Sequence, residues 1–388
     1  MNNSQQYRPL PFVDRGKHRR GDAVEGPSRI LMSVDAVGGV WRYAMDLAEQ
    51  FRLHGIETIF AGFGPPPSEA QSLEAGKIGV LMWSDLPLDW MVDDEHQLRA
   101  VPDFLKQSAA EYGIDLLHLN LPSQAVGLDI NLPVVVVSHS CVVTWFEAVH
   151  GCAVPARWLW QDRRNRTGFD RADAVLAPSR SHAQALQRCY GPIANLALVF
   201  NASKHEPVPS AKEDFVFAAG RWWDEGKNAR LLDEAARESS WTVIMAGATD
   251  GPAGQHVHLH HALRLGEVSH GHVMALMARA AIVASPSLYE PFGLAVLEAA
   301  HAGAALVLAD IPTYRELWSD AALFADARDA GRFCDAINRL ADDESARLEL
   351  ATCAKRRAQS FSAERQCLRL LDVYRRAMRR SCKLTAAG

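Results

Sequence analysis

The chain has 388 residues, of which 48% are hydrophobic and 22% charged, so it can form the cores of two globular domains. Its formal charge of −5 gives no broad electrostatic reason to bind nucleic acid, and no apolar run approaches the roughly eighteen residues of a membrane span. The seven cysteines lack a CxxC pair, which favours reduced thiols and a cytoplasmic protein.

Residues 1–27 are polar and lack the apolar centre of a signal peptide, so we expect a disordered tail there. This tail contains one of two basic clusters, formed by Arg15, Lys17, Arg19 and Arg20. The second lies near the other end of the chain and comprises Arg375, Arg376, Arg379, Arg380 and Lys383. Solvation is the simpler explanation of both clusters. Weak peripheral contact with the inner face of an anionic membrane is the alternative.

Residues 28–205 alternate between apolar runs and helical patterns. The runs that predict strands lie at 30–34, 57–63, the end of 101–120, 133–140, 172–179 and 196–200. Gly38 and Gly39 make a turn after the first run, and a helical pattern then runs from Val40 to a stop at Gly55. Alternating strands and helices predict a parallel sheet covered on both faces.

A polar linker at 201–214 interrupts this pattern, and we place the domain boundary between residues 205 and 206. Residues 206–361 repeat the alternation, with strands predicted at 215–220, 241–247, 256–263, 280–287, 304–310 and 321–325. Two α/β Rossmann-like domains would bind a ligand in the cleft between the carboxyl ends of their strands. We expect the amphipathic helix at 362–388, apolar at Leu368, Leu371 and Val373, to pack back on the first domain.

Two acids frame the segment SLYEPFGLAVLE at 287–298. Pro291 suits a first helical turn, so we predict a helix over 291–302 with Glu290 at its start and Glu298 inside it. The N-terminus of such a helix favours an anion such as phosphate. Because a carboxylate repels a diphosphate, Glu290 and Glu298 must accept hydrogen bonds from other groups of the ligand. Sugar hydroxyls are suitable donors. The alternative is one helix-capping acid and one solvated acid.

Arg221 follows a predicted strand, and Lys227 stands six positions later, just before a helix. Two cations from one loop can clamp a diphosphate, the arginine as a fork and the lysine as a point charge. A solvated basic loop is the alternative. The intervening Trp222 and Trp223 are more simply explained by packing than by ligand binding.

Further candidates have weaker signals. The turn at Gly38 and Gly39 allows close approach to the backbone, but it is not GxGxxG, which disfavours a dehydrogenase. His139 stands at the carboxyl end of a predicted strand, where either a catalytic or a structural role fits. On a strand, the histidines at 256, 258 and 260 would share a face, but no cysteine or carboxylate pattern accompanies them, so we predict no metal site.

Taken together, these segments resemble the retaining glycosyltransferases of the GT-B fold, especially those of family four. Glu290, seven residues and Glu298, with EPFGL between them, resemble the E-x7-E signature of that family. The segments DAVGGVWRYAMDLA, RADAVLAPSRSHAQAL, LGEVSHGHVMALMARAAIVASPS and ADIPTYREL are similar to its other characteristic segments. The resemblance extends over most of the chain from Ser28.

The resemblance implies a role for each candidate residue. Arg221 and Lys227 would hold the donor diphosphate, and Glu298 would bind the ribose hydroxyls. Glu290, with the backbone N–H groups of Phe292, Gly293 and Leu294, would contact the transferred sugar and its phosphate. His139 would lie near the reacting carbon, and Gly38 and Gly39 would line the cleft near the acceptor or the phosphate. The backbone at Glu267 and Val268 would contact the nucleobase.

The function implied is transfer of a sugar from a nucleotide-diphosphate sugar to a hydroxyl acceptor with retention of configuration, without a metal or other cofactor. The acceptor would be a glycan or a lipid-linked sugar, as in polysaccharide or glycoconjugate synthesis, and its side of the cleft would be shaped by residues 141–166. A nucleotide-sugar epimerase, a phosphorylase and a non-catalytic nucleotide-sugar-binding protein are the alternatives. A phosphorylase would need a pyridoxal-binding lysine, for which the sequence offers no candidate.

Overall fold

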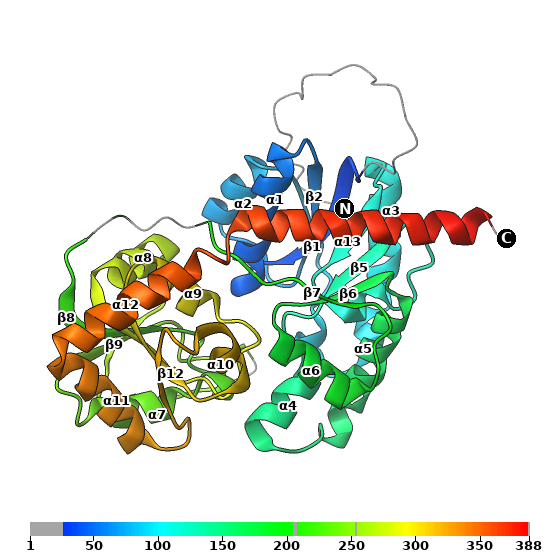
Figure 1. Ribbon diagram of the computed structural model, residues 1–388. Coiled ribbons are helices and arrows are strands. Elements are labelled where there is room, and N and C mark those ends of the chain that lie inside the picture. Colours follow the sequence, from blue (N-terminus) through cyan, green and yellow to red (C-terminus); the bar gives the residue numbers. More distant parts are fainter. Residues whose placement is uncertain (1–25, 205–207, 209, 253, 387–388) are drawn as a thin grey trace.

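Two parallel α/β units make up the computed structural model (Figure 1). It describes residues 26–204, 208, 210–252 and 254–386, and side chains as far as residue 380. The predicted tail therefore lies almost wholly outside the described residues, as does the predicted domain boundary. Two facing doubly wound units confirm the predicted fold class.

The first unit contains a seven-stranded sheet in the order β3-β2-β1-β4-β5-β6-β7, with every neighbouring pair parallel. Its strands are β1 (Arg29–Asp35), β2 (Glu57–Phe63), β3 (Val80–Trp83), β4 (Leu116–Leu119), β5 (Val134–Val137), β6 (Ala174–Ala177) and β7 (Leu196–Leu198). Its helices are α1 (Gly39–Leu53), α2 (Glu69–Gly76), η1 (Asp89–Met91), η2 (Glu95–Leu98), α3 (Val101–Tyr112), η3 (Pro122–Ala125), α4 (Val142–His150), η4 (Ala156–Trp158), α5 (Leu159–Arg171) and α6 (Arg180–Tyr190).

The second unit contains a six-stranded parallel sheet in the order β10-β9-β8-β11-β12-β13. Its strands are β8 (Glu213–Ala219), β9 (Thr242–Ala246), β10 (Leu263–Gly266), β11 (Ala280–Ser285), β12 (Ala305–Ala309) and β13 (Leu323–Ala325). Its helices are η5 (Glu225–Lys227), α7 (Ala229–Ala236), α8 (His270–Arg279), α9 (Leu294–His301), α10 (Pro312–Trp318), α11 (Ala330–Asp342) and α12 (Glu344–Ala358).

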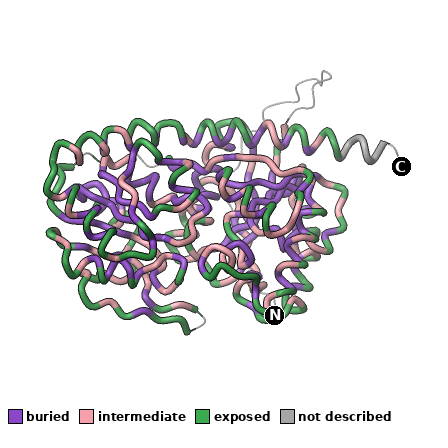
Figure 2. The backbone as a smooth tube through the Cα atoms, turned by 60° about the horizontal axis from the view of Figure 1, so that its bottom comes forward, coloured by how far each residue is buried: buried purple, intermediate pink, exposed green. Residues whose placement is uncertain are grey.

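The cores explain why the apolar runs predicted the strands. Residues of β5 and β12 are buried on both faces of their sheets, as parallel strands between two helical layers must be. Figure 2 shows buried residues concentrated inside each unit and exposed residues along the outer helices. Within the described residues, no helix has both the length and the apolar character needed to span a membrane.

The final helix, α13 (Ala363–Ala386), runs across the first unit (Figure 1). Five of its buried residues join the apolar core that includes α1 and β1, namely Cys367, Leu370, Leu371, Tyr374 and Ala377. The prediction of Leu368 as an apolar contact was wrong, because this side chain is 47% exposed.

Two further predictions were wrong. The helix predicted at 291–302 begins at Leu294, because Gly293 adopts a left-handed conformation with φ 91° and interrupts a helix from Pro291. The segment 256–263 forms no long strand. The Asp233 carboxylate accepts hydrogen bonds from the backbone N–H groups of His260, His261 and Ala262, which hold this segment as a loop before β10.

Candidate active site

A cleft of about 1120 Å³ lies between the two units. It lies where the strand order reverses in each sheet, between β1 and β4 and between β8 and β11, which is where open parallel sheets bind ligands. Most predicted site residues line it, namely Gly38, Gly39, His139, Arg221, Lys227, Glu290, Phe292, Gly293, Leu294 and Glu298. Val268 lies outside this lining.

The two predicted cations face the cleft from the loop after β8. Arg221 lies with its guanidinium 5.5 Å from the centre of the Trp223 ring, and its Nη2 atom is 3.6 Å from Asp224 Oδ2. A Cβ atom at Gly38 would lie 3.6 Å from Arg221 Nη1, so this side chain reaches the glycine turn of the first unit. Trp222 is buried and donates from Nε1 to the Ala246 carbonyl, which confirms its packing role.

Lys227 and Glu290 form an ion pair at the floor of the cleft. Lys227 Nζ lies 2.5 Å from Glu290 Oε2, and the two side chains are only 21% and 16% exposed. The pairing is possible because the residues just after β11 are bonded to η5, where the Leu288 N–H donates to the Gly226 carbonyl. A negatively charged ligand can bind here because Lys227 offsets the charge of Glu290.

The N-terminus of α9 opens toward this ion pair. Gly293 occupies its N-cap position and supplies no side-chain hydrogen bond, so the first N–H groups of the helix are available to an anion. Phe292 is buried against Phe361, with ring centroids 5.6 Å apart, which fixes the approach to the helix. The resulting arrangement of two cations and one helix N-terminus suits a diphosphate.

Glu298 lies on α9 and is 8% exposed. Burial raises its pKa from 4.5 to about 7, with Asp46 adding to this rise and Arg42 opposing it. The nearest imidazole nitrogen, His270 Nε2, is 3.7 Å from Glu298 Oε1. A carboxylate with so little hydration is suited to hydrogen bonds from ligand hydroxyls.

Replacing Glu298 with glutamine is therefore expected to stabilise the ligand-free protein at pH 8 and not at pH 4. Between pH 4.5 and about 7 the folded protein binds this proton more tightly than the unfolded chain, so wild-type stability falls as pH rises. One pKa unit corresponds to about 1.4 kcal/mol, which sets an upper limit of roughly 3 kcal/mol for the gain. Thermal melts across this pH range would measure it. Exposed Glu349→Gln is the control, and an equal gain at pH 4 and pH 8 would contradict the assignment.

His139 is held by a chain of hydrogen bonds in the first unit. Asn120 Nδ2 donates to the Ser33 carbonyl, which leaves Asn120 Oδ1 to accept from His139 Nε2 at 2.9 Å. The ring also lies edge-on to Tyr43, at 4.5 Å between centroids. Burial lowers the pKa of His139 to about 3, although part of the ring faces the cleft. The neutral ring thus carries its proton on Nε2 and can accept a hydrogen bond through Nδ1.

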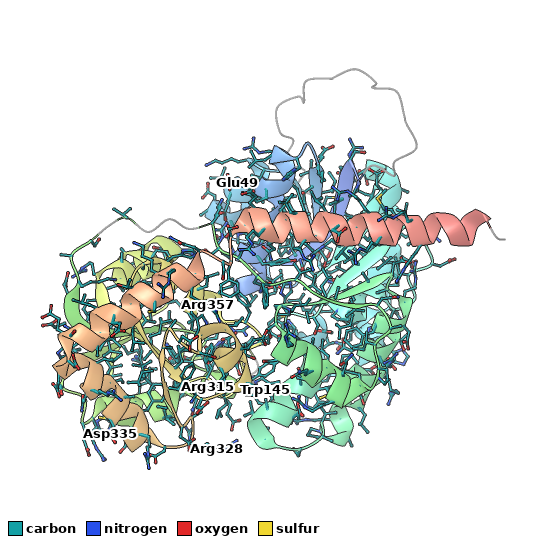
Figure 3. The ribbon with its side chains drawn as sticks, viewed as in Figure 1. Glu49, Trp145, Arg315, Arg328, Asp335 and Arg357 are labelled. Atoms are coloured by element: carbon teal, nitrogen blue, oxygen red, sulfur yellow. The ribbon has the colours of Figure 1, made fainter. Side chains whose placement is uncertain are left out.

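Several cleft residues have no motif in the sequence. Asp35 ends β1, Asn120 follows β4, and Trp145 on α4 donates from Nε1 to Asp224 Oδ1 at 3.0 Å across the two units. Figure 3 shows Trp145 where the two units meet. The position of Asp35, directly after an apolar strand and before the glycine turn, is the signal that could have identified it.

Of the three predicted histidines, His256 lines the cleft, whereas His258 and His260 lie outside its lining. His256 Nε2 is 3.1 Å from His258 Nδ1, and His256 Nδ1 is 2.5 Å from Asp250 Oδ1. Among the described residues, no group of three or more histidine, cysteine, aspartate or glutamate side chains could hold a metal ion. The six cysteines with described side chains are free thiols.

A ligand cleft between two facing parallel sheets is the architecture of the GT-B fold. The pattern of the glycosyltransferase family 4 matches residues 37–202, and that of the glycosyl transferases group 1 matches residues 201–357. The chain belongs to this family of glycosyltransferases. The expected family resemblance is thereby confirmed.

Curated proteins with similar sequences match only part of this chain. A D-inositol 3-phosphate glycosyltransferase of Nocardioides sp. is 36% identical over 26% of this chain and 22% of its own length. A glycogen synthase of Mycobacterium tuberculosis is 35% identical over 25% of this chain and 24% of its own length. The matched part thus spans about a quarter or less of these curated relatives.

The structural similarity extends over nearly the whole chain. The sucrose-phosphate synthase of Thermosynechococcus elongatus superimposes with a TM-score of 0.75 at 18% identity, covering 93% of this chain and 100% of its own. Anabaena HepE in complex with UDP and glucose gives a TM-score of 0.70 at 18% identity, covering 89% and 98%. At this level of identity the similarity establishes the fold.

Proposed function

We propose that the protein transfers a sugar from a nucleotide-diphosphate sugar to a hydroxyl of a glycan or lipid-linked sugar, with the anomeric configuration retained. The observation that carries the proposal is the convergence of Arg221, the Lys227–Glu290 pair and the N-terminus of α9 on one cleft. This arrangement supplies positive charge where a departing diphosphate gains negative charge.

The remaining groups support the sugar side of the reaction. As the anomeric bond breaks, electrons move to the diphosphate, and the acceptor hydroxyl attacks the same face of the sugar. Its proton passes to a phosphate oxygen of the leaving group. His139 stays neutral and orients a sugar hydroxyl through Nδ1, while Glu298 binds the ribose. No metal or other cofactor has a step in this proposal.

A weak peripheral membrane contact through α13 forms a secondary part of the proposal. Arg376 pairs with Asp372, and Arg380 bonds to Asn195, so these two residues of the basic cluster already have partners in the protein. Arg375 and Arg379 remain exposed and could approach an anionic surface.

A binding and turnover panel tests the proposed function. We expect UDP, or another nucleoside diphosphate, to raise the melting temperature, and its sugar conjugate to yield a glycosylated product when an acceptor is present. UDP-glucose is the first donor to try, because the structurally similar HepE was crystallised with it. Conversion of the donor sugar without an acceptor would indicate an epimerase. Binding without turnover would indicate a silent binding protein, and no binding by any nucleotide would refute the proposal.

A further inference from the structure

The Asp35 carboxylate has a single hydrogen-bond donor among the residues that the structure describes. The residue ends β1, lines the cleft and is only 5% exposed. Its Oδ1 atom accepts from the Val37 N–H at 2.9 Å, and among the described residues its carboxylate has no other hydrogen-bond donor. A buried carboxylate with unused lone pairs is costly unless a ligand satisfies them.

The position of Asp35 limits what that ligand can be. Asp35, Asn120 and His139 follow the ends of β1, β4 and β5, which are neighbours in the first sheet. They face the side of the cleft opposite Glu290 and Glu298, which belong to the second unit. A group bound at Asp35 therefore lies on the first-unit side of the cleft, across from Glu290 and Glu298, with Arg221 of the second unit near enough to act on the Asp35 carboxylate.

The charges around Asp35 favour a neutral hydroxyl. Burial raises the pKa of Asp35 to about 6, with Asp89 adding to the rise and Arg221 opposing it. Asp89 is itself buried and accepts from the Ser123 hydroxyl at 2.5 Å. Buried Arg164 offsets the charge of Asp89, and Arg157 lies exposed above Trp158. Once a diphosphate occupies Arg221, no described cation that acts on Asp35 remains free to compensate its carboxylate. A phosphate group beside Asp35 would be repelled, whereas a hydroxyl would donate to it.

We propose that Asp35 binds a hydroxyl of the acceptor, and that the acceptor portion held there is an uncharged sugar. This inference rests on the proposed glycosyl transfer. In this proposal the Asp35 carboxylate disfavours acceptors that carry a phosphate. Asp35 lies just before the glycine turn at Gly38, which the Arg221 side chain approaches.

The test compares wild type with Asp35→Asn, using the best donor of the nucleotide panel. The acceptors are methyl, octyl and nitrophenyl glucosides, and glucose 6-phosphate as the charged probe. We expect the wild type to favour a neutral glucoside. In Asp35→Asn, KM for that glucoside should rise at least about tenfold, while Kd for the nucleoside diphosphate stays within about threefold. Asp233→Asn, a buried carboxylate outside the cleft, is the control for losing a buried charge.

Three results would overturn the inference: an unchanged glucoside KM in Asp35→Asn, an equal loss of nucleotide affinity, or a wild-type preference for glucose 6-phosphate. If Asp35→Asn melts far below wild type, Asp35→Ser gives the same comparison. If no glucoside is an acceptor, a crystal of the UDP complex soaked with methyl glucoside decides. Sugar hydroxyls bonded to Asp35 would support the inference, and their absence would refute it. Failure of wild type to bind any nucleotide would instead refute the proposed function.

Discussion

Replacing Lys227 with alanine is expected to lower kcat/KM for the nucleotide sugar by about 10²–10³-fold, the usual cost of removing one preorganised group that stabilises developing negative charge. The lysine is mostly buried, so water cannot readily replace its ammonium group. The loss should exceed that of a simple cation deletion, because Glu290 would remain at the phosphate site without the partner that now lies 2.5 Å away.

A second substitution separates these two effects. In Lys227→Ala the unpaired Glu290 repels the diphosphate, whereas Lys227→Ala/Glu290→Ala removes both charges. We therefore expect UDP to bind the double variant more tightly than the single Lys227 variant. Sugar transfer should stay low in both, because Glu290 is also needed beside the transferred sugar. Calorimetry of UDP binding and steady-state kinetics measure the two quantities independently.

Lys106→Ala is the control, because this lysine is exposed on α3 and away from the cleft. Near-normal turnover in Lys227→Ala would refute the assignment of the diphosphate site. The single variant Glu290→Ala completes the comparison. If the losses of UDP affinity in Lys227→Ala and Glu290→Ala add up to the loss in the double variant, Lys227 and Glu290 act independently in spite of their contact.

The sequence predicted the scaffold well for a physical reason. Strands such as β5 and β12 lie between two layers of helices, so both of their faces are apolar, and a continuous apolar run is a direct sign of that environment. Where a strand is short or partly exposed, the sign weakens. β3 was missed, and β10 was placed too early, since its preceding segment is held by Asp233, a residue 27 positions before His260 in the chain.

The sequence predicted those parts of the candidate site whose residues lie close together in one loop or one helix. Arg221 and Lys227 share one loop, so their convergence was foreseeable, as was the position of Glu298 on a helix. The contact between Lys227 and Glu290 was not, because it depends on how β8 and β11 pair in the sheet. Asp35 also escaped prediction, since a single aspartate after a strand has no pattern of its own.

Contacts between the two units could not be predicted from local sequence patterns, and those of Glu316 on α10 are the clearest example. Its carboxylate accepts hydrogen bonds from the N–H groups of Arg180 and Ser181, at 2.9 and 2.7 Å, and from the Ser181 hydroxyl at 2.7 Å. It thus caps the N-terminus of α6 from the opposite unit, where a negative charge is favourable. Tyr289 and Thr144 make a second link, with 2.8 Å between their hydroxyl oxygens.

Glu316→Ala is expected to lower sugar transfer by about 30-fold while changing Kd for UDP by less than about threefold. Apart from the glycine turn at Gly38 and Gly39, the proposed nucleotide contacts come from the second unit, so UDP binding depends little on the facing unit. Transfer does require it, because His139 must face the donor sugar. Loss of the hydrogen bonds from Arg180 and Ser181 to the Glu316 carboxylate should destabilise the arrangement in which the two units face each other by about 2 kcal/mol. This free energy corresponds to the expected 30-fold loss of transfer rate.

Steady-state kinetics and UDP calorimetry measure this separation, and small-angle scattering should report a larger radius of gyration for Glu316→Ala. Asp310→Ala is the matched control, because Asp310 lies just before α10, pairs with Arg315 of α10 at 2.6 Å and makes no described hydrogen bond or ion pair with α6. If UDP affinity falls as much as sugar transfer does, Glu316 acts on the nucleotide site of the second unit and not on the contact between the units. Unchanged transfer would mean that the remaining links, such as Tyr289 with Thr144, hold the two units together without it.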